Sequence, residues 1–377
     1  MSHQVACVVG TRPEVVKMAP LVARLREVGP GVKVRVVSTG QHRGLLDRAL
    51  ADFGIAADLD LGLMRGGQGL ADLTARTLVA LAGAFEADRP DLVLAQGDTT
   101  SVMATALACH YGRIPFGHVE AGLRTGRRYL PFPEEMNRAL TSRMAEVHFA
   151  PTAEARANLV REGIDPGSIH VTGNTVIDAL LLMAGRATPL PVRPTTERFL
   201  LVTAHRRENW GGPLRRVCEA LRSVVARNPD LSLVFPVHPN PEVRRVADEC
   251  LGGLDRVHLI GPVGYPEFVA LMKASYLIVT DSGGVQEEAP SLGKPVLVLR
   301  GETERPEAVE AGTALLVGTD GGAILASVER LLGDPEAYRT FARTVNPYGD
   351  GRASGRIVEV LRRRFGLGAA DPAVPEA

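Results

Sequence analysis

Three acidic side chains stand where strands of the first half of the chain are expected to end. Asp98 follows a strand expected at 92–96, Glu120 follows one expected at 114–119, and Glu134 opens the helix that comes next. Ligands of open α/β sheets bind at the carboxyl ends of the parallel strands, so these acids should share one rim. Carboxylates clustered in a partly closed site push one another's pKa values apart, which lets one site supply both an acid and a base.

Each of these acids also has a purely structural interpretation. Asp98 could cap the helix that follows it, because aspartate is a frequent N-cap residue. Glu134 and Glu135 could simply favour the positive end of a helix. The arrival of three acids on one rim nonetheless favours the chemical interpretation.

Basic residues gather after the first strand. The segment 10–14 reads Gly-Thr-Arg-Pro-Glu, Lys17 lies about one helical turn on, and Pro13 suits the first position of a helix. A helix N-terminus flanked by Arg12 and Lys17 is a natural anion site, although basic residues near a helix start are common on protein surfaces. The fingerprint G-x-G-x-x-G is missing here, so we expect no dinucleotide cofactor.

The second half of the chain repeats this arrangement. His205 and His238 each follow a strand, where an imidazole can act as an acid, a base or a phosphate partner. Another strand is followed by Ser282, Gly283 and Gly284, and paired glycines let backbone N–H groups approach a diphosphate closely. Glu288, a turn into the next helix, is then placed to bind a ribose diol. A plain tight turn is the alternative, and the paired acids after the glycines make it the weaker one.

Short apolar runs alternate with helical patterns along the chain, which predicts doubly wound α/β structure. The runs are continuous, as is typical of parallel strands covered on both faces. Strands are expected at 5–9, 34–38, 92–96, 114–119, 146–150 and 169–172, and again at 199–203, 231–236, 257–260, 277–280, 295–299 and 314–317. Helices are expected at 13–28, 70–87, 101–111 and 134–145.

The restart of the pattern indicates two Rossmann-like domains. We expect them at 1–172 and 173–350, followed by a disordered tail at 367–377. A connector at 187–197 contains three prolines and precedes the restart, so a hinge is expected near 172–190.

The bulk composition excludes several classes of protein. A chain of 377 residues is long enough for two domains with a core each. Its 43 basic residues balance 43 acidic ones, which argues against binding to nucleic acid or to an anionic membrane. No apolar run approaches the ~18 residues that span a bilayer, and the four scattered cysteines have no metal-type spacing. We therefore expect a cytoplasmic protein without a bound metal.

Long ordered motifs resemble a known family. From about Gly10 to Ile357 the chain is similar to the non-hydrolysing UDP-N-acetylglucosamine 2-epimerases. The motifs that carry this resemblance include GTRPEVVKMAP, QGDTTS, GHVEAGLRTG, PFPEEMNR, TAHRRENW, PVHPNP, TDSGGVQEEAPSLGKPVLVLR, ETERPEAVEAGT and NPYGDGRASGRI. The resemblance implies a GT-B-type fold, in which two Rossmann-like domains face each other across a cleft and a C-terminal helix, here 351–366, returns to the first domain.

The resemblance also implies roles for individual residues. The implied catalytic residues are Asp98, Glu120, Glu134, His205 and Lys17. The implied substrate-binding residues are Arg12, Lys17, Asp98, Glu120, His205, Phe268 near the uracil, Ser282, Gly283 and Gly284 at the diphosphate, Glu288 at the ribose, and Arg305. Gln41, Arg206 and His238 resemble a second site at which the substrate itself activates members of the family. Val263 departs from the pattern, because some members have a polar residue there.

The implied reaction is the reversible epimerisation of UDP-N-acetylglucosamine to UDP-N-acetylmannosamine at C2. The C2 proton is not acidic, because no carbonyl group lies beside it. Loss of UDP from C1 together with that proton gives a 2-acetamidoglucal, to which UDP and a proton add back with C2 inverted. This needs a carboxylate base, an acid on the opposite face of the sugar, and cations around the departing diphosphate. The sequence leaves the proton transfers open among Asp98, Glu120 and Glu134, and no cofactor is needed.

Other functions fit part of the pattern. A glycosyltransferase of the same fold could use UDP-N-acetylglucosamine as donor, but the neutral composition does not indicate the apolar or basic acceptor groove that it needs. A UDP-sugar sensor would keep 282–288 and lose the acids of the first domain, which are present. A hydrolysing epimerase that releases free N-acetylmannosamine is a third alternative. We also expect a homodimer whose domains close around the nucleotide sugar.

Overall fold

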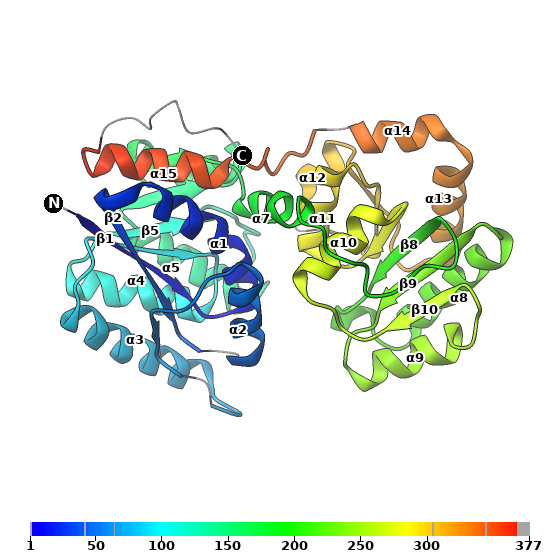
Figure 1. Cartoon of the computed structure of the whole chain (residues 1–377), viewed down its shortest axis with the longest axis horizontal. Helices are drawn as coiled ribbons and strands as arrows, with labels where there is room; N and C mark the ends of the chain where they lie inside the picture. The colour runs from blue at the N-terminus through cyan, green and yellow to red at the C-terminus, as the bar shows by residue number, and fades with distance from the viewer. Residues whose placement is uncertain (1, 41–42, 64, 304, 344, 368–377) are drawn as a thin grey trace. The chain divides into compact units, whose positions relative to one another are not determined.

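The computed structural model describes residues 2–40, 43–63, 65–303, 305–343 and 345–367. The chain forms two compact units, one made of Met1–Ala179 and Tyr348–Ala377 and the other of Leu180–Pro347 (Figure 1). The division falls inside helix α7 (Thr175–Ala184), a few residues beyond the expected boundary at 172. Of the tail expected from residue 367, Leu367 is described and packs against the core of the first unit.

Parallel strands form the sheet of the first unit. Within the described residues this sheet has seven strands in the order β3-β2-β1-β4-β5-β6-β7. The strands are β1 (His3–Val9), β2 (Val32–Ser38), β3 (Leu59–Asp60), β4 (Leu92–Gln96), β5 (Phe116–Val119), β6 (Val147–Ala150) and β7 (Ile169–Val171). The sequence analysis missed β3, because a strand of two residues leaves no apolar run to detect.

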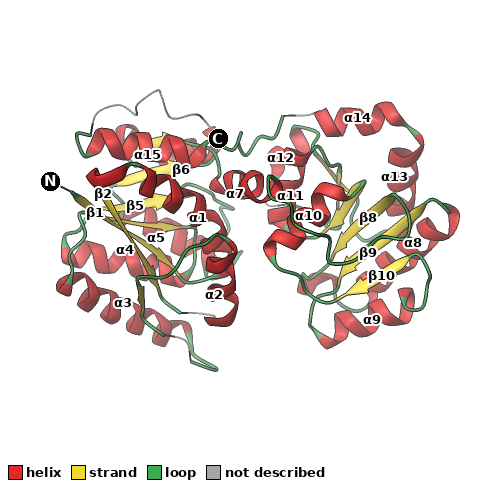
Figure 2. Cartoon of the chain, in the orientation of Figure 1, coloured by secondary structure: helices red, strands yellow, loops and turns green. Residues whose placement is uncertain are grey.

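Helices cover both faces of this sheet (Figure 2). They are α1 (Arg12–Glu27), α2 (Arg43–Asp52), α3 (Leu70–Ala87), α4 (Thr100–Gly112), α5 (Glu134–Met144), α6 (Ala153–Arg161) and α15 (Ala353–Arg364), with short 3₁₀ turns at Gly29–Gly31 and Pro166–Ser168. Helix α15 lies beside α1, and its Ile357 and Leu361 are buried in the same core as Val5 and Leu21 (Figure 1). The expected return of the C-terminal helix to the first domain is confirmed.

The second unit is also doubly wound. Its described residues form a six-stranded parallel sheet in the order β10-β9-β8-β11-β12-β13. The strands are β8 (Arg198–Thr203), β9 (Leu231–Pro236), β10 (Val257–Ile260), β11 (Leu277–Thr280), β12 (Val296–Val298) and β13 (Ala314–Leu316). The helices are α8 (Gly212–Arg227), α9 (Pro241–Leu251), α10 (Tyr265–Ala274), α11 (Gly283–Glu288), α12 (Pro306–Glu310), α13 (Gly321–Gly333) and α14 (Pro335–Arg343), with 3₁₀ turns at Arg207–Asn209 and Ala289–Leu292.

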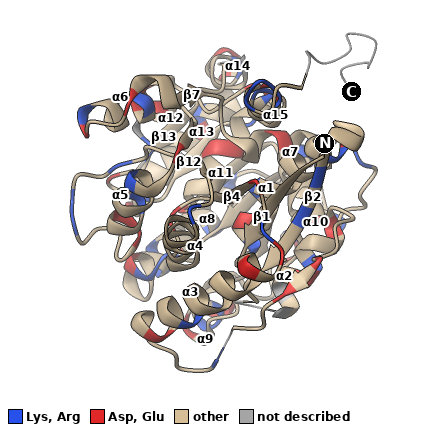
Figure 3. Cartoon of the chain, turned by 90° about the vertical axis from the view of Figure 1, so that its left-hand side faces the viewer, with Lys and Arg blue, Asp and Glu red and all other residues tan. Residues whose placement is uncertain are grey.

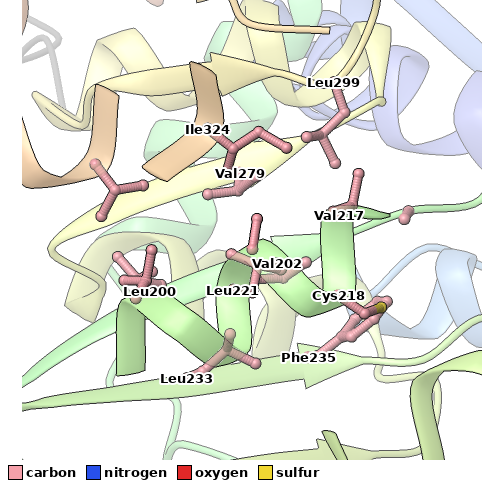
Figure 4. Close-up of a cluster of buried hydrophobic side chains, with 14 of the residues drawn as sticks. Leu200, Val202, Val217, Cys218, Leu221, Leu233, Phe235, Val279, Leu299 and Ile324 are labelled. Carbon is pink, nitrogen blue, oxygen red and sulfur yellow. The ribbon is translucent and has the colours of Figure 1, made fainter. Parts of the chain in front are cut away.

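The core of the second unit explains why its strands read as continuous apolar runs. Val202 of β8 and Phe235 of β9 pack against Val217 and Leu221 of α8, and all four are almost completely buried (Figure 4). Burial of each such side chain contributes roughly 1.5–3 kcal/mol to folding. The predicted fold class, two Rossmann-like doubly wound α/β domains, is confirmed.

The surface and the cysteines agree with the composition. Acidic and basic residues are interspersed along helices such as α3 and α9 (Figure 3). The four cysteines are free and buried, and burial raises the pKa of the Cys7 thiol to about 12. Over the described part of the chain, no helix is both long and apolar enough to cross a membrane.

The strand order changes direction at one point in each sheet. In the first unit the chain winds outward on either side of β1 and β4, and in the second on either side of β8 and β11. Ligands of doubly wound folds bind outside the carboxyl ends of the strands at such switch points. The segments after these strands are therefore where the candidate site is to be sought.

Candidate active site

The N-terminus of α1 is fixed by a buried acid. The Thr11 side chain accepts a hydrogen bond from the Glu14 N–H, and Glu14 Oε2 accepts hydrogen bonds from the Thr11 N–H at 3.3 Å and from the Gly10 N–H at 2.6 Å. Burial raises the pKa of Glu14, whose exposed fraction is 2%. This capping box starts the helix at Arg12, one residue before the predicted start. Among the described residues the Arg12 side chain has neither a hydrogen bond nor an ion pair, which leaves its guanidinium available to a ligand.

Lys17 and Glu120 meet at the carboxyl end of the first sheet. Lys17 Nζ lies 2.5 Å from Glu120 Oε2, and Gln96 Nε2 donates to the same oxygen at 2.7 Å. The Lys17 side chain is 15% exposed and that of Glu120 is 7% exposed, so little solvent screens the pair. Glu120 has a φ of +64°, a conformation that residues other than glycine rarely adopt and that is often found at functional sites.

Asp98 is held by a second cation. Arg138 donates to Asp98 Oδ2 through Nε at 2.9 Å and through Nη2 at 2.7 Å. The same guanidinium donates to Glu135 Oε2 at 3.0 Å. Glu135 in turn accepts hydrogen bonds from the backbone N–H groups of Thr125 and Gly126. Arg138 therefore ties Asp98 to the loop that leads from β5 to α5.

The structure excludes one interpretation of Asp98, that of a helix cap. The N-cap of α4 is Thr99, whose side chain accepts a hydrogen bond from the Val102 N–H. The alternative that Asp98 caps this helix is therefore wrong. The Asp98 carboxylate is partly exposed, at 29% of its side-chain surface, and faces a cation instead.

Glu134 begins α5 and is partly buried. Within the described part of the chain its carboxylate makes no hydrogen bond or ion pair. The neighbouring Glu135 accepts hydrogen bonds from the Thr125 N–H and from the guanidinium of Arg138. The two acids of this helix thus have different roles, which their adjacent positions in the sequence did not reveal.

His118 lies beneath this group of residues. It is fully buried in β5, and its Nε2 hydrogen-bonds to the carbonyl oxygen of Gly97 at 2.7 Å. Burial lowers the pKa of His118 to about 3, so the ring is neutral at physiological pH. His118 therefore supports the turn after β4 and does not contact a ligand.

A histidine and a buried acid meet at the switch point of the second sheet. His205 Nδ1 lies 3.0 Å from Asp281 Oδ1. Asp281 is 0% exposed, whereas the His205 side chain is 41% exposed. Burial acts to raise the pKa of Asp281, but hydrogen bonds from His205, the Arg206 N–H and Asn209 outweigh it and leave the pKa below its ordinary value.

The glycine-rich turn follows Asp281. Ser282, Gly283 and Gly284 lead into α11, and the side chain of Ser282 makes no capping hydrogen bond. The first backbone N–H groups of a helix have no acceptor within it, so those of the two glycines can bind an anion. A Cβ atom on Gly283 would lie 3.8 Å from Nη2 of Arg206, which places that guanidinium beside the turn.

Glu288 ends α11 and is buried. Tyr265, at the start of α10, donates its hydroxyl hydrogen to Glu288 Oε1 at 2.6 Å. Phe268 lies about one turn further along the same helix and is partly buried. Arg305 makes an ion pair with the buried Glu287. The predicted ribose acid, uracil neighbour and arginine thus occupy connected elements of one unit.

The comparisons with known proteins agree over almost the whole chain. The family model described as UDP-N-acetylglucosamine 2-epimerase matches residues 25–362. The chain is 50% identical over 370 residues to the UDP-N-acetylglucosamine 2-epimerase of Salmonella typhimurium, covering 95% of this chain and 98% of that one. Its identity to the enzyme of the same name from Bacillus subtilis is 49% over 371 residues, with coverages of 98% and 97%.

The chain belongs to the UDP-N-acetylglucosamine 2-epimerase family. A solved structure of the UDP-GlcNAc 2-epimerase from Neisseria meningitidis, bound to UDP-GlcNAc, has a TM-score of 0.86 to this chain at 45% identity. The match covers 96% of this chain and 100% of that one. The resemblance on which the sequence analysis relied is confirmed.

The structure of this epimerase-family chain adds residues that the sequence analysis did not select. Gln96 and Arg138 hold Glu120 and Asp98, Tyr265 holds Glu288, and Asp281 holds His205. Gln96, Arg138 and Asp281 stand in the family motifs, and that position is the signal that could have found them, whereas Tyr265 stands in none of the quoted motifs.

The three residues predicted for a second, activating site of the epimerase are placed unequally. Gln41 lies outside the described residues. Arg206 lies beside Gly283, and the His238 ring centroid is 6.4 Å from that of His205. Both therefore adjoin residues predicted to bind the substrate diphosphate. No group of three or more potential metal ligands occurs within the described residues.

Proposed function

We propose that this protein interconverts UDP-N-acetylglucosamine and UDP-N-acetylmannosamine without hydrolysing them. The observation that carries the proposal is the Lys17–Glu120 ion pair, 2.5 Å long, at the carboxyl end of a doubly wound sheet. It sets an acid next to a cation at the edge where such folds bind their ligands. Membership in the family, together with the UDP-GlcNAc bound to the Neisseria meningitidis relative, supports the same substrate here.

The reaction proceeds by elimination and re-addition. A base removes the C2 proton as the bond from C1 to the diphosphate oxygen breaks, and the electrons of the C2–H bond form the C1–C2 double bond of the glycal. UDP then adds back at C1 while an acid delivers a proton to the opposite face of C2. The protein must therefore supply two proton-transfer groups and stabilise a departing diphosphate.

The three acids differ in their contacts. Asp98 and Glu120 each pair with a cation within 3 Å. Glu134 makes no hydrogen bond or ion pair among the described residues. We propose that the two proton transfers are divided among these three carboxylates.

The groups of the second unit are suited to the nucleotide. The N–H groups of Gly283 and Gly284 and the exposed ring of His205 can bind the diphosphate, and Glu288 can accept hydrogen bonds from the ribose. Arg12, whose guanidinium is uncommitted, can bind phosphate as well.

Turnover of UDP-N-acetylglucosamine in deuterated water tests the reaction. We expect NMR to show UDP-N-acetylmannosamine with deuterium at C2, and deuterium also in recovered substrate, because the exchanged proton comes from solvent. An epimer that keeps its original C2 hydrogen would refute elimination. Transfer of the sugar to an added acceptor without exchange would indicate a glycosyltransferase, and free N-acetylmannosamine would indicate hydrolysis.

Three further properties belong to the same proposal. We infer that the enzyme works in the cytoplasm, which the four free cysteines support, and that it is a homodimer, which light scattering can test. We also infer that a second UDP-N-acetylglucosamine molecule contacts Arg206 and His238 and activates the enzyme. Rates that are hyperbolic in substrate, with no requirement for UDP-N-acetylglucosamine in the reverse direction, would refute the activating site.

A further inference from the structure

We propose that Asp281 is a positioning residue that fixes the proton of His205 on Nδ1 and aims Nε2 at the substrate diphosphate. This inference rests on the proposed function, because it assumes that His205 meets a diphosphate. The residues that form it are held together by one strand pair. Asp281 follows β11, His205 follows β8, and the Asp281 N–H donates to the carbonyl oxygen of Thr203 at 3.2 Å.

The two oxygens of Asp281 share one donor and differ in the others. The His205 backbone N–H donates to Oδ1 at 3.1 Å and to Oδ2 at 3.0 Å. Oδ1 also faces His205 Nδ1 at 3.0 Å, whereas Oδ2 also accepts hydrogen bonds from the Arg206 N–H at 2.9 Å and from Asn209 Nδ2 at 3.0 Å. With 0% exposure, Asp281 cannot touch a ligand. Any effect of this carboxylate on a substrate must therefore pass through the residues that it binds.

A carboxylate oxygen can only accept a hydrogen bond, so His205 must donate from Nδ1. In its neutral form the ring then has a lone pair on Nε2, which would repel a phosphate oxygen. In its protonated form the ring donates from both nitrogens, and Nε2 can bind the diphosphate through a charge-assisted hydrogen bond. We therefore expect UDP binding to be coupled to protonation of His205.

The neighbouring charged groups agree with this division. His238 faces His205 across 6.4 Å between ring centroids, and burial together with the charge of His205 lowers the pKa of His238. The Asn240 N–H donates to His238 Nδ1 at 3.2 Å, so the neutral His238 has its proton on Nε2. Arg206 adds a positive charge nearby, beside Gly283. Of the two rings, that of His205 lies within hydrogen-bond distance of the buried Asp281 carboxylate.

Replacing Asp281 by asparagine has a defined consequence. The amide has one accepting and one donating group, while donors approach the native carboxylate on both sides. The backbone N–H groups of His205 and Arg206 and the side chain of Asn209 all donate to Oδ2 and cannot reverse their polarity, so the amide oxygen should take that position. The ring of His205 can reverse its polarity, by moving its proton to Nε2 and accepting at Nδ1. The Asp281→Asn protein should therefore contain the opposite neutral tautomer of His205.

The test combines NMR of the free protein with calorimetry of UDP binding. Long-range ¹H–¹⁵N spectra of ¹⁵N-histidine protein should show the Nδ1–H tautomer of His205 in the wild type and the Nε2–H tautomer in Asp281→Asn. Wild-type UDP affinity should fall as pH rises from 6 to 8, with proton uptake visible as a dependence of the binding heat on buffer. Asp281→Asn should weaken UDP binding about tenfold at pH 6 and remove most of the pH dependence.

Two control variants separate this role from a structural one. Asn209→Ala removes a hydrogen bond to Oδ2 but leaves the contact of Oδ1 with His205, so it should keep the native tautomer and proton uptake. In a His205→Gln background, Asp281→Asn should cause no further loss of UDP affinity. An equal loss in both backgrounds would overturn the proposal.

The spectrum of the wild type tests the predicted tautomer of His205 even if the Asp281→Asn protein does not fold. A neutral His205 with its proton on Nε2 would refute the proposal. These measurements need no turnover, so they are independent of the deuterium experiment: a failed epimerase assay with the native tautomer and proton uptake intact would sink the proposed reaction and leave the role of Asp281 standing.

Discussion

Replacing Glu120 by glutamine should abolish most of the activity while leaving the fold and nucleotide binding nearly intact. Glutamine has almost the same shape, and its amide oxygen can still accept from Lys17 and Gln96, whose donor atoms lie 2.5 and 2.7 Å from Oε2. The variant therefore loses a negative charge and the ability to exchange a proton. Loss of one acid–base group lowers kcat by roughly 10²–10⁴-fold. This corresponds to about 2.7–5.4 kcal/mol of transition-state stabilisation.

The stability of the variant can be estimated separately. A charged hydrogen bond becomes a neutral one in a site where the two side chains are 15% and 7% exposed. We expect a loss of about 1–2 kcal/mol in the free energy of unfolding. For a unit of roughly 200 residues this lowers Tm by about 2–8 °C. Replacing Lys17 by methionine should then cost less in the Glu120→Gln background than in the wild type, because the two residues are coupled.

The assay measures epimerisation by NMR, UDP affinity by calorimetry and Tm by scanning calorimetry on the same samples. Glu146→Gln is the matched control, since Glu146 pairs with Arg364 in the same unit but precedes β6, at the amino end of the sheet. It should keep wild-type kcat. If Glu120→Gln turns over at the wild-type rate, or if its loss of activity equals its loss of UDP affinity, Glu120 has no part in the chemistry.

Two other predictions concern nucleotide affinity and pH. Glu288→Ala should weaken UDP binding by roughly 1.5–3 kcal/mol through loss of charged hydrogen bonds. Tyr265→Phe should weaken it less, because this variant keeps Glu288 and loses the hydrogen bond that supports it. Calorimetry that finds unchanged affinity in both variants would place the ribose elsewhere, and Tyr276→Phe, which removes a hydroxyl bonded to Leu331, serves as the control. The pKa of His118 is about 3 in the folded state against 6.5 ordinarily, so at pH values between these two the unfolded chain binds a proton that the folded chain does not. The contribution of His118 to the free energy of unfolding is therefore complete above pH 6.5. It is lost as the pH falls toward 3, by up to about 1.4 kcal/mol per pH unit. Urea unfolding at pH 5 and 7 should therefore show a smaller pH dependence for His118→Gln than for the wild type, and an equal dependence would contradict the assignment.

The elements of the fold were predictable because parallel strands buried on both faces leave continuous apolar runs. Strands β9, β10 and β11 begin and end at the predicted residues, and α3 does so too. The strand β3 escaped because it pairs through two residues only. The start of α1 was placed one residue late, since the capping box of Thr11 and Glu14 outweighs the preference of Pro13 for the first position.

The sequence predicted where the candidate site lies, at the carboxyl ends of the strands, but not the contacts within it. The rule that ligands bind at carboxyl ends of strands places Lys17 near Glu120 although 103 positions separate them in the sequence. It does not say which cation pairs with which acid. Arg138 ends the motif PFPEEMNR, but its position in a helix does not indicate that it pairs with Asp98. The positive φ of Glu120 could not be foreseen either, because local propensity assigns that conformation to glycine.

The exposure of each carboxylate decides what it can do for the reaction. At the carboxyl end of the first sheet, Glu120 is 7% and Asp98 29% exposed, so both keep contact with solvent. At the switch point of the second unit, Asp281 is 0% exposed and can act only through the ring of His205. Both sites pair an acid with a donor from a neighbouring element, and we propose that the difference in burial suits the first pair to proton transfer and the second to orienting a phosphate ligand. The same sheet geometry thus produces two chemically different devices, and a substitution at Asp281 should change the pH dependence of UDP binding, whereas one at Glu120 should change turnover alone.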